Sequence, residues 1–324
     1  MILAGDIGGT KTHLALFEQQ GKNLQVSVEE TFVSRDFTSL EAVVLLFIKS
    51  HPQKIDRACF GVAGPVRAGC VQTTNLPWVV DIGDLSKQFN IQNATLINDL
   101  EANAHGLSHL EPKDFWVLNP GDSEATGNAA LISAGTGLGE AGLFWDGKQY
   151  FPFASEGGHA DFAPMDALQS ELLSHLQARF NHVSWEHVLS GPGLQNIYLF
   201  LRDSGHGEEP QWLTEKMQTS DPSATITQAA LEQTSPLCEQ TLQLFVTFYG
   251  AEAGNLALKL LATGGLFIGG GIAPKILPAL KTDGFMNAFI AKGRLQPVLE
   301  KIPVRVVLND RTALIGAAHY ALNH

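Results

Sequence analysis

A pattern of strand, glycine-rich turn and returning strand occurs twice in this chain and sets the tightest limit on its fold. Residues 2–17 carry it around Gly8-Gly9-Thr10-Lys11, and residues 129–144 carry it around Gly135-Thr136-Gly137, at a constant offset. Apolar stretches on either side of a short glycine-rich turn predict a β-hairpin in each place. A unit that recurs in both halves of a chain indicates a duplicated lobe.

Strands followed by helices make up most of the remaining pattern, which is typical of an α/β protein. Thr38-Ser39-Leu40-Glu41 matches a capping box ahead of an apolar run. The polar stretch 203–236 predicts surface helices and loops. Further strands are expected at 58–62, 94–99, 266–268 and 303–308, and helices at 42–48, at 100–107, from 273 onward and at 312–322.

Composition excludes several classes of protein. A chain of 324 residues with 44% hydrophobic residues can bury a large core and should form two lobes. A net charge of -12 without any run of Lys and Arg argues against a nucleic-acid surface. The longest apolar run, 42–48, is too short to span a membrane, and no signal-peptide region precedes Asp6. We therefore expect a cytoplasmic protein.

The cysteines do not form a recognisable site. Cys59, Cys70 and Cys238 are widely spaced, so neither a disulfide framework nor a zinc site is expected.

Two familiar phosphate motifs match by spacing but fail on context. Residues 142–148 resemble a Walker A loop, yet Gln149 stands where Ser or Thr should hold magnesium. Residues 137–142 fit the dinucleotide pattern, but strands are expected after them instead of a helix. Asp146-Gly147 is better explained as a hairpin turn.

The two recurring turns are better candidates for phosphate binding. Gly8-Gly9-Thr10 and Gly135-Thr136-Gly137 can each bring backbone N–H groups and a Thr hydroxyl against phosphate oxygens. Asp6, beside the first turn, could then hold Mg²⁺ through water. The alternative is that these glycines only permit tight hairpins, and recurrence in both halves favours function.

Two further groups of polar residues suit a sugar. Asn98-Asp99 ends a predicted strand with an amide and a carboxylate, which can orient a hydroxyl and remove its proton. The alternative is that Asp99 is a helix N-cap. Glu156 and His159, separated by two glycines, can converge on adjacent sugar hydroxyls, whereas zinc would need more ligands. Glu186, taken alone, is expected to be a solvated residue in a first helical turn.

Together these motifs resemble bacterial glucokinases, from the hexokinase and actin-like ATPase superfamily. The resemblance implies a two-lobed, actin-like (ribonuclease-H-type) fold with a central cleft where ATP and sugar meet. It implies a small lobe of residues 1–109 plus 301–324 and a large lobe of residues 110–300. The matching segments, in the family's order, are Gly5-Asp6-Ile7-Gly8-Gly9-Thr10, Ile97-Asn98-Asp99, Gly135-Thr136-Gly137-Leu138-Gly139, Glu156-Gly157-Gly158-His159, Ser190-Gly191-Pro192-Gly193-Leu194 and Gly269-Gly270-Gly271-Ile272-Ala273-Pro274.

The same resemblance implies a reaction and a role for each residue. ATP, with Mg²⁺, would phosphorylate glucose to glucose 6-phosphate, an early step of glycolysis. Asp99 would be the general base, and the two turns would cradle phosphates. Sugar hydroxyls would be held by Asn98, Glu156, His159 and Glu186, and adenosine would be bordered by Gly270 and Gly271.

Several alternatives remain at the level of sequence. The substrate could be another hexose or an amino-sugar, the donor ADP or polyphosphate, or the chain a non-sugar actin-like ATPase. A sugar-responsive transcription regulator is disfavoured, because the first strand begins at residue 2 and leaves no room for a DNA-binding module. The zinc-binding cysteines of the related repressor, kinase and open-reading-frame family are missing. A homodimer is expected, because closed symmetry is common.

Overall fold

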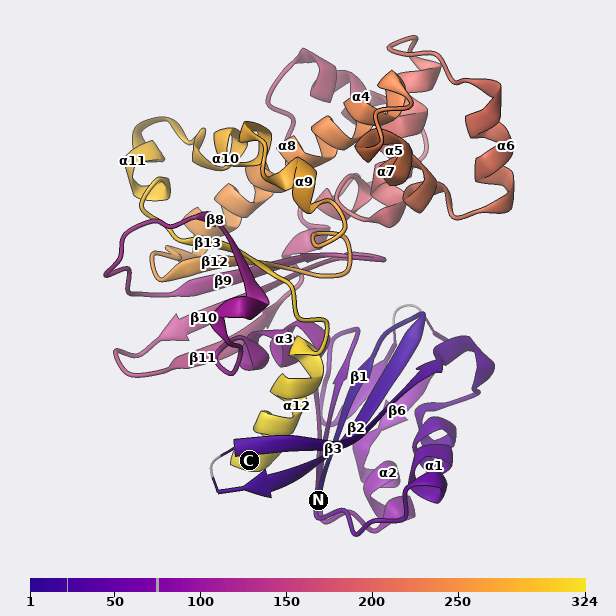
Figure 1. The fold of residues 1–324 in the computed structure, drawn as a ribbon, viewed down its shortest axis with the longest axis vertical. Coiled ribbons are helices and arrows are strands. Elements are labelled where there is room, and N and C mark those ends of the chain that lie inside the picture. The colour runs from indigo at the N-terminus through magenta and orange to yellow at the C-terminus, as the bar shows by residue number, and fades with distance from the viewer. Residues whose placement is uncertain (22, 74–75) are drawn as a thin grey trace. The chain divides into compact units, whose positions relative to one another are not determined.

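A computed structural model describes residues 1–21, 23–73 and 76–324 of the chain (Figure 1). The chain divides into two compact units. The first contains Met1–Asp114, Phe151–Ala154 and Asn309–His324, and the second contains Phe115–Tyr150 and Ser155–Leu308. No helix in the described ranges combines the length and the apolar character that a membrane crossing requires.

The first unit is built on a sheet with the strand order β3-β2-β1-β4-β7. β1 pairs antiparallel with β2, which confirms the first hairpin, and pairs parallel with β4; β4 pairs parallel with β7. Ile7, Val62 and Asn98 are in register, so the carboxyl ends of three parallel strands meet at one edge. The strands are β1 (Ile2–Ile7), β2 (Lys11–Gln20), β3 (Asn23–Val33), β4 (Arg57–Val62) and β7 (Asn93–Asn98).

Helices cover both faces of this sheet. α1 (Leu40–Ser50) and α2 (Ile82–Phe89) lie on one face, and α3 (Asp99–Leu107) and α12 (Thr312–Asn323) lie on the other (Figure 1). Successive side chains of a strand point to opposite faces. Leu3 therefore packs in the cluster with α1, while Ile2 and Ala4 pack in the cluster with α12. The connecting elements are η1 (Ser34–Asp36), β5 (Cys70–Gln72), β6 (Val79–Asp81) and η2 (Pro112–Asp114).

A second sheet has the order β11-β10-β9-β12-β13-β8 and belongs to the second unit, apart from Phe151–Ala154 of β11, which is grouped with the first unit. β9 and β10 form an antiparallel hairpin, as the repeat predicts, and β12 runs parallel to both β9 and β13. The carboxyl ends of β9 and β12 therefore lie together, and a glycine-rich turn follows each. The strands are β8 (Phe115–Asn119), β9 (Ala129–Ala134), β10 (Leu138–Trp145), β11 (Tyr150–Ser155), β12 (Gly265–Gly269) and β13 (Val304–Val307).

A long buried helix, α8 (Pro236–Leu260), is the centre of the second unit's core. It contacts β9 of the sheet and the helices α5, α7 and α10. The helices and turns of this unit are η3 (Gly157–His159), α4 (Ala167–Gln177), η4 (Trp185–His187), α5 (Gly191–Asp203), α6 (Gln211–Thr219), α7 (Pro222–Leu231), α9 (Leu277–Leu280), α10 (Asp283–Ile290), η5 (Gly293–Leu295) and α11 (Gln296–Leu299).

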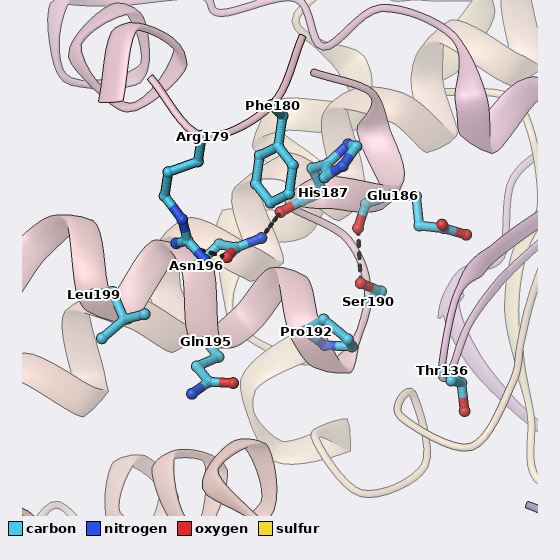
Figure 2. Close-up of a pocket in the computed structure, with 10 residues that line it drawn as sticks. All are labelled: Thr136, Arg179, Phe180, Glu186, His187, Ser190, Pro192, Gln195, Asn196 and Leu199. Atoms are coloured by element: carbon cyan, nitrogen blue, oxygen red, sulfur yellow. Dashed lines mark hydrogen bonds between the residues drawn. The ribbon is translucent and has the colours of Figure 1, made fainter. Parts of the chain in front are cut away.

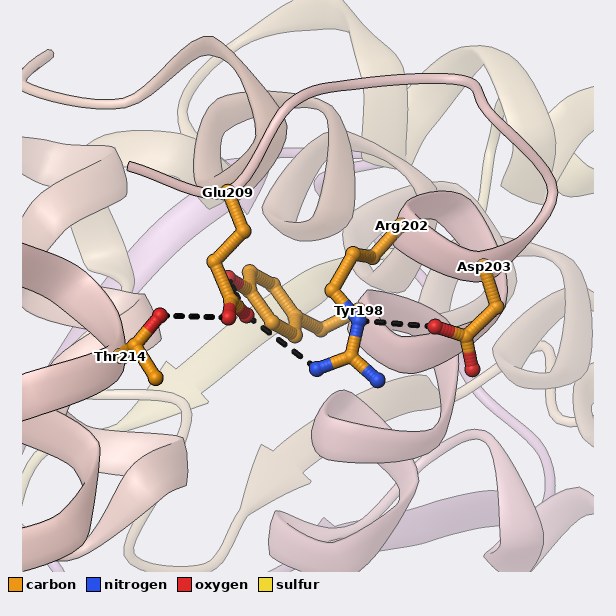
Figure 3. A network of polar contacts seen from close by, with 5 residues as sticks. All are labelled: Tyr198, Arg202, Asp203, Glu209 and Thr214. Carbon is orange, nitrogen blue, oxygen red and sulfur yellow. Dashed lines mark hydrogen bonds and ion pairs between the residues drawn. The ribbon is translucent and has the colours of Figure 1, made fainter. Parts of the chain in front are cut away.

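The polar stretch 203–236 forms helices, as expected, and is held by a carboxylate. Glu209 accepts hydrogen bonds from the hydroxyls of Tyr198 and Thr214, both at 2.6 Å (Figure 3). Arg202 also contacts Glu209, at 3.3 Å, and pairs with Asp203 at 2.8 Å. A charged acceptor shared by several donors stabilises a loop well, so this network anchors the path between α5 and α6.

Several boundaries differ from the sequence predictions, including residues 110–114 and 151–154, which were expected in the large lobe and belong to the first unit. Ser39, not Thr38, caps α1, because its side chain accepts the Ala42 N–H. The segment after Gly271 forms turns, and the next helix, α9, begins only at Leu277. Residues 301–308, expected in the small lobe, belong to the second unit, because β13 pairs with β12 and β8.

Candidate functional site

The carboxyl edge of the first sheet carries Asp6, Asn98 and Asp99. Asn98 ends β7 and is the N-cap of α3: its side-chain oxygen accepts the N–H groups of Leu100 and Glu101 at 2.9 and 3.3 Å. Asp99 is the first residue of α3, and its Oδ1 accepts the Leu100 N–H at 3.0 Å. Asn98, and not Asp99, is therefore the N-cap of α3. The alternative that Asp99 serves only as a helix N-cap is thus wrong.

Asp6 lies near enough to Asp99 for their charges to interact. Although Asp6 keeps some exposed surface, its carboxyl is surrounded by protein atoms. Desolvation, followed by the negative charge of Asp99, raises the pKa of Asp6 to about 7. Two carboxyl groups that repel one another at a strand end form a site where a cation would relieve the repulsion.

The first glycine turn is held from behind by Ser34. The Ser34 hydroxyl donates to the Gly8 carbonyl at 2.8 Å, and the Ser34 N–H donates to the Thr10 carbonyl at 3.0 Å. The Gly8 N–H closes the turn on the Lys11 carbonyl at 2.9 Å. Thr10 is exposed and Gly9 is half-buried, so the turn presents its tip to solvent.

The second glycine turn is bound to Glu186. The Gly135 N–H donates to the Gly137 carbonyl at 2.8 Å, and Glu186 Oε2 accepts the Leu138 N–H at 2.9 Å. A Cβ on Gly137 would collide with that same carboxylate oxygen. Glu186 is half-buried, so the expectation of a simple solvated residue is wrong: its carboxylate shapes the turn while Thr136 stays exposed.

The third glycine segment packs directly against the second. Gly270 has a φ of +82°, and a Cβ there would collide with the Ala134 carbonyl oxygen. Only glycine readily tolerates both the positive φ and the close approach to the carbonyl oxygen. The buried Tyr249 hydroxyl accepts the Ala134 N–H at 3.1 Å and donates to the Gly269 carbonyl at 3.3 Å. One side chain of α8 thus joins the ends of β9 and β12, where both turns start.

Glu156 and His159 lie on a short turn that packs against the turn carrying Glu186. Glu156 Oε2 and His159 Nε2 are 3.9 Å apart, and both side chains are more than half exposed. The Trp185 N–H donates to the Ala160 carbonyl at 3.0 Å, which joins η3 to η4. The three side chains assigned to the sugar within the second unit are therefore carried by adjacent turns.

A cavity of about 390 Å³ opens beside Glu186. Figure 2 shows Arg179 and Asn196 on one side of it and Thr136 and Glu186 toward the other. The full lining is Thr136, Arg179, Phe180, Glu186, His187, Ser190, Pro192, Gln195, Asn196 and Leu199. Thr136 of the second glycine turn and Glu186 thus face a hollow in the second unit.

The structure gathers the predicted residues into one group in each unit. Asp6, Asn98 and Asp99 share an edge with the turn at Gly8-Gly9-Thr10. The second group contains Gly135, Thr136, Gly137, Glu156, His159, Glu186, Gly270 and Gly271. Ser34 and Tyr249, which hold the turns, went unnoticed in the sequence because nothing in their local pattern indicates a long-range hydrogen bond. Within the described ranges, no group of three or more His, Cys, Asp or Glu side chains is arranged to hold a metal.

Comparison with known proteins identifies the relatives of this architecture. A family model described as Glucokinase matches residues 3–324. The glucokinase of Trichormus variabilis is 45% identical over 337 residues, covering 98% of this chain and 98% of the relative. The crystal structure of a glucokinase from an Antarctic psychrotroph has a TM-score of 0.85 and 33% identity, covering 100% of this chain and 99% of that one.

A more distant structure agrees in fold. The ROK family glucokinase of Streptomyces griseus, solved with glucose and AMPPNP, has a TM-score of 0.68 at 19% identity and covers 100% and 99% of the two chains. At that identity the likeness concerns the fold alone.

Proposed function

This chain belongs to the glucokinase family and transfers a phosphoryl group from ATP to glucose, and we propose that Asp99 is the general base of that reaction. It has the two-lobed actin-like ATPase fold of these sugar kinases. The observation that carries the proposal is the capping of α3 by Asn98. Because Asn98 supplies the cap, α3 does not need a carboxylate at Asp99, whereas proton transfer does.

We propose sugar-binding roles for Asn98 in the first unit and for Glu156, His159 and Glu186 in the second, each judged within its own unit. Asn98 contributes an amide whose nitrogen donates to the Gly64 carbonyl at 3.2 Å, so its orientation is defined. Glu156, His159 and Glu186 contribute carboxylates and an imidazole, which accept from and donate to hydroxyl groups. Adjacent hydroxyls of a hexose are suited to such pairs. This arrangement favours a sugar over a non-sugar ATPase substrate.

ATP is assigned to the three glycine turns. The Gly8 and Gly135 N–H groups close the turns at Gly8-Gly9-Thr10 and Gly135-Thr136-Gly137 from within. The N–H groups that follow them in each turn would face phosphate oxygens, and the exposed hydroxyls of Thr10 and Thr136 would add donors. Gly270 and Gly271 would border the adenosine, and a Cβ on Gly271 would meet open space, which leaves room for a ligand.

The carboxylate of Asp6 is suited to binding a magnesium ion through a water molecule. Mg²⁺ usually keeps several waters and binds through one or two carboxylates together with substrate phosphates. A single carboxylate whose pKa is raised by burial and by Asp99 is a reasonable partner for such an ion. When bound, the ion would offset negative charge on the phosphates.

The chemical step requires alignment and one proton acceptor. A sugar hydroxyl oxygen attacks the γ-phosphorus, the bond to the bridging oxygen of ADP breaks, and the hydroxyl proton passes to an Asp99 carboxylate oxygen. Phosphoryl transfer needs little covalent help from the protein, so the remaining residues act by positioning and by charge. The expected products are glucose 6-phosphate and ADP.

The test is Asp99→Asn, with Asp84→Asn as a matched control from the first turn of α2. Asn keeps the shape of the side chain and its acceptor oxygen but cannot take the proton. We expect kcat to fall by about 10²-fold to 10⁴-fold with a smaller change in the glucose KM. Asp84→Asn should leave kcat unchanged. A kcat for Asp99→Asn within a few-fold of the unmodified protein would refute the assignment.

Substrate choice, assembly and location are tested separately. A coupled assay that compares glucose with other hexoses and amino-sugars, and ATP with ADP and polyphosphate, defines the acceptor and the donor. We also propose a homodimer, which sedimentation can test. We expect the enzyme to work in the cytoplasm, where its free cysteines Cys59, Cys70 and Cys238 would stay reduced.

A further inference from the structure

Two buried acidic side chains interact with one another, and one of them, Glu140, lies beneath the turn that carries Glu156 and His159. Glu140 on β10 is 1% exposed and Glu252 on α8 is 0% exposed. Glu252 accepts hydrogen bonds from Asn255 Nδ2 at 2.8 Å and from Lys259 Nζ at 3.2 Å. Glu140 Oε1 has no hydrogen-bond partner in the described part of the chain. An ionised carboxylate in that state would be costly.

The positive charges near Glu140 and Glu252 neutralise only one of the two carboxylates. Lys259 forms an ion pair with Glu252. Lys292, the other cation of the cluster, donates to the Ala251 carbonyl at 2.9 Å and to Asn255 Oδ1 at 2.7 Å, and burial lowers its pKa. No ion pair to Glu140 occurs among the residues that the structure describes.

The carboxyl group of Glu140 is therefore more stable in its protonated form. Burial, followed by the charge of Glu252, raises the pKa of Glu140 to about 8; the charge of Lys259 opposes this shift, and a hydrogen bond to Glu252 adds to it. Two neighbouring buried carboxyl groups commonly share one proton in this way, because both cannot ionise at low cost.

Gly157 lies directly on the Glu140 carboxyl group. A Cβ at Gly157 would collide with Glu140 Oε2, and a Cβ at Gly158 would collide with the Leu138 carbonyl oxygen. The Gly157 N–H donates to Ser155 Oγ at 3.0 Å. The two glycines between Glu156 and His159 thus let the turn sit close against β10. The sequence suggested that they leave room for a ligand, and the structure shows that they also leave room for Glu140.

We propose that Glu140 is a positioning residue: sharing a proton with Glu252, it seats the turn 156–159 on β10 and so orients Glu156 and His159 toward the sugar. The inference rests on the proposed sugar-binding role of those two residues. Removal of the proton would place a second negative charge beside Glu252. The simplest relief is for the turn to lift and admit water, which would weaken sugar binding while leaving the ATP turns in place.

The sign of the pH effect follows from the raised pKa. Below about pH 8 Glu140 is protonated and the turn is seated; above it the seated population falls. If only the seated form binds sugar, the glucose KM should rise about tenfold between pH 6.5 and pH 9. Glu140→Gln mimics the protonated acid, because an amide can donate to Glu252 at any pH, so its glucose KM should not show this rise.

The experiment compares the unmodified enzyme, Glu140→Gln and the control Glu232→Gln, which alters an exposed glutamate at the end of α7. The glucose KM, the ATP KM and kcat are measured from pH 6.5 to pH 9. Amide exchange in the turn 156–160 is measured at each pH and corrected for the intrinsic exchange rate at that pH. Taking the ratio of variant to unmodified enzyme cancels titrations that the two share, including any of Asp99.

The expected result is a glucose KM ratio that diverges with pH for Glu140→Gln alone, with faster exchange in the turn of the unmodified enzyme above pH 8 and an unchanged ATP KM ratio. If the unmodified enzyme and Glu140→Gln show the same exchange rates in the turn at every pH, the positioning role is overturned. Faster exchange without a change in the glucose KM would also overturn it and would place the failure in the sugar-binding assignment of Glu156 and His159. If Glu140→Gln folds poorly, the exchange rate of the turn in the unmodified enzyme, divided by the intrinsic rate at the same pH, decides the question, and a ratio that stays constant from pH 6.5 to pH 9 refutes the proposal.

Discussion

Removal of one buried oxygen at Tyr249 should impair ATP binding more than sugar binding. The Tyr249 hydroxyl links the Ala134 N–H and the Gly269 carbonyl, the last residues of β9 and β12. Tyr249→Phe retains the fully buried ring and deletes only these two contacts. A buried N–H and a buried carbonyl are then left without this partner at the start of the two glycine turns that follow β9 and β12.

The magnitude follows from the cost of unpaired buried groups. Leaving a buried donor or acceptor unsatisfied costs about 1–3 kcal/mol. The two turns can relax so that the Ala134 N–H and the Gly269 carbonyl find new hydrogen-bond partners. Restoring the turns to their nucleotide-binding shape then costs the same free energy, which weakens nucleotide binding. Since about 1.4 kcal/mol corresponds to tenfold in affinity, the ATP KM should rise by about 5-fold to 100-fold. The glucose KM should change less than the ATP KM, because Glu156 and His159 lie on a different turn and, of the three sugar-binding candidates in the second unit, only Glu186 contacts the second glycine turn.

Tyr198→Phe is the matched control. Tyr198 is equally buried in the same unit, but its hydroxyl donates to Glu209, in the network of Figure 3. This control should lower the unfolding temperature without changing the ATP KM. The assay is steady-state kinetics in both substrates beside thermal unfolding of each variant. If Tyr249→Phe and Tyr198→Phe lose stability alike and both keep the unmodified ATP KM, the tyrosine only stabilises the core and the reasoning is refuted.

Two further predictions concern charge in the first unit. Asp6→Asn should raise the magnesium concentration for half-maximal rate by about 10-fold to 100-fold. The pKa of Asp6 is raised in the folded protein to about 7, so ionisation of Asp6 lowers the stability of the fold as the pH rises from about 4 to 7. Asp6→Asn removes this destabilisation. The variant should therefore unfold at a higher temperature than the unmodified enzyme at pH 8, and should show no such gain at pH 4. His109 and His319 stack with ring centroids 3.3 Å apart, and burial, followed by His109, lowers the pKa of His319 to about 4. The unfolded state then binds more protons below pH 6.5, so the urea midpoint should fall from pH 6.5 toward pH 4 and fall less in His319→Gln; parallel profiles would contradict this.

Local patterns in the chain were sufficient for most of the elements and for locating the candidate site residues on them. Alternation around the glycine turns predicted both hairpins, which the structure confirms as β1–β2 and β9–β10. The polar end of β7 predicted where Asn98 and Asp99 lie on the sheet edge. Boundaries were less well predicted: Thr38 competes with Ser39 for the cap, and only the backbone path decided between them.

The sequence by itself determined which chemical groups are available and on which kind of element each is carried, because hairpins, caps and strand ends depend on residues close together along the chain. Only the tertiary structure decided which distant groups meet. Glu186 binds the turn at Gly137, Tyr249 joins the ends of β9 and β12, and Glu140 lies beneath Gly157. Each contact joins segments separated by a long stretch of chain, and a buried polar side chain acquires its proton and its partner from whatever the packing brings beside it.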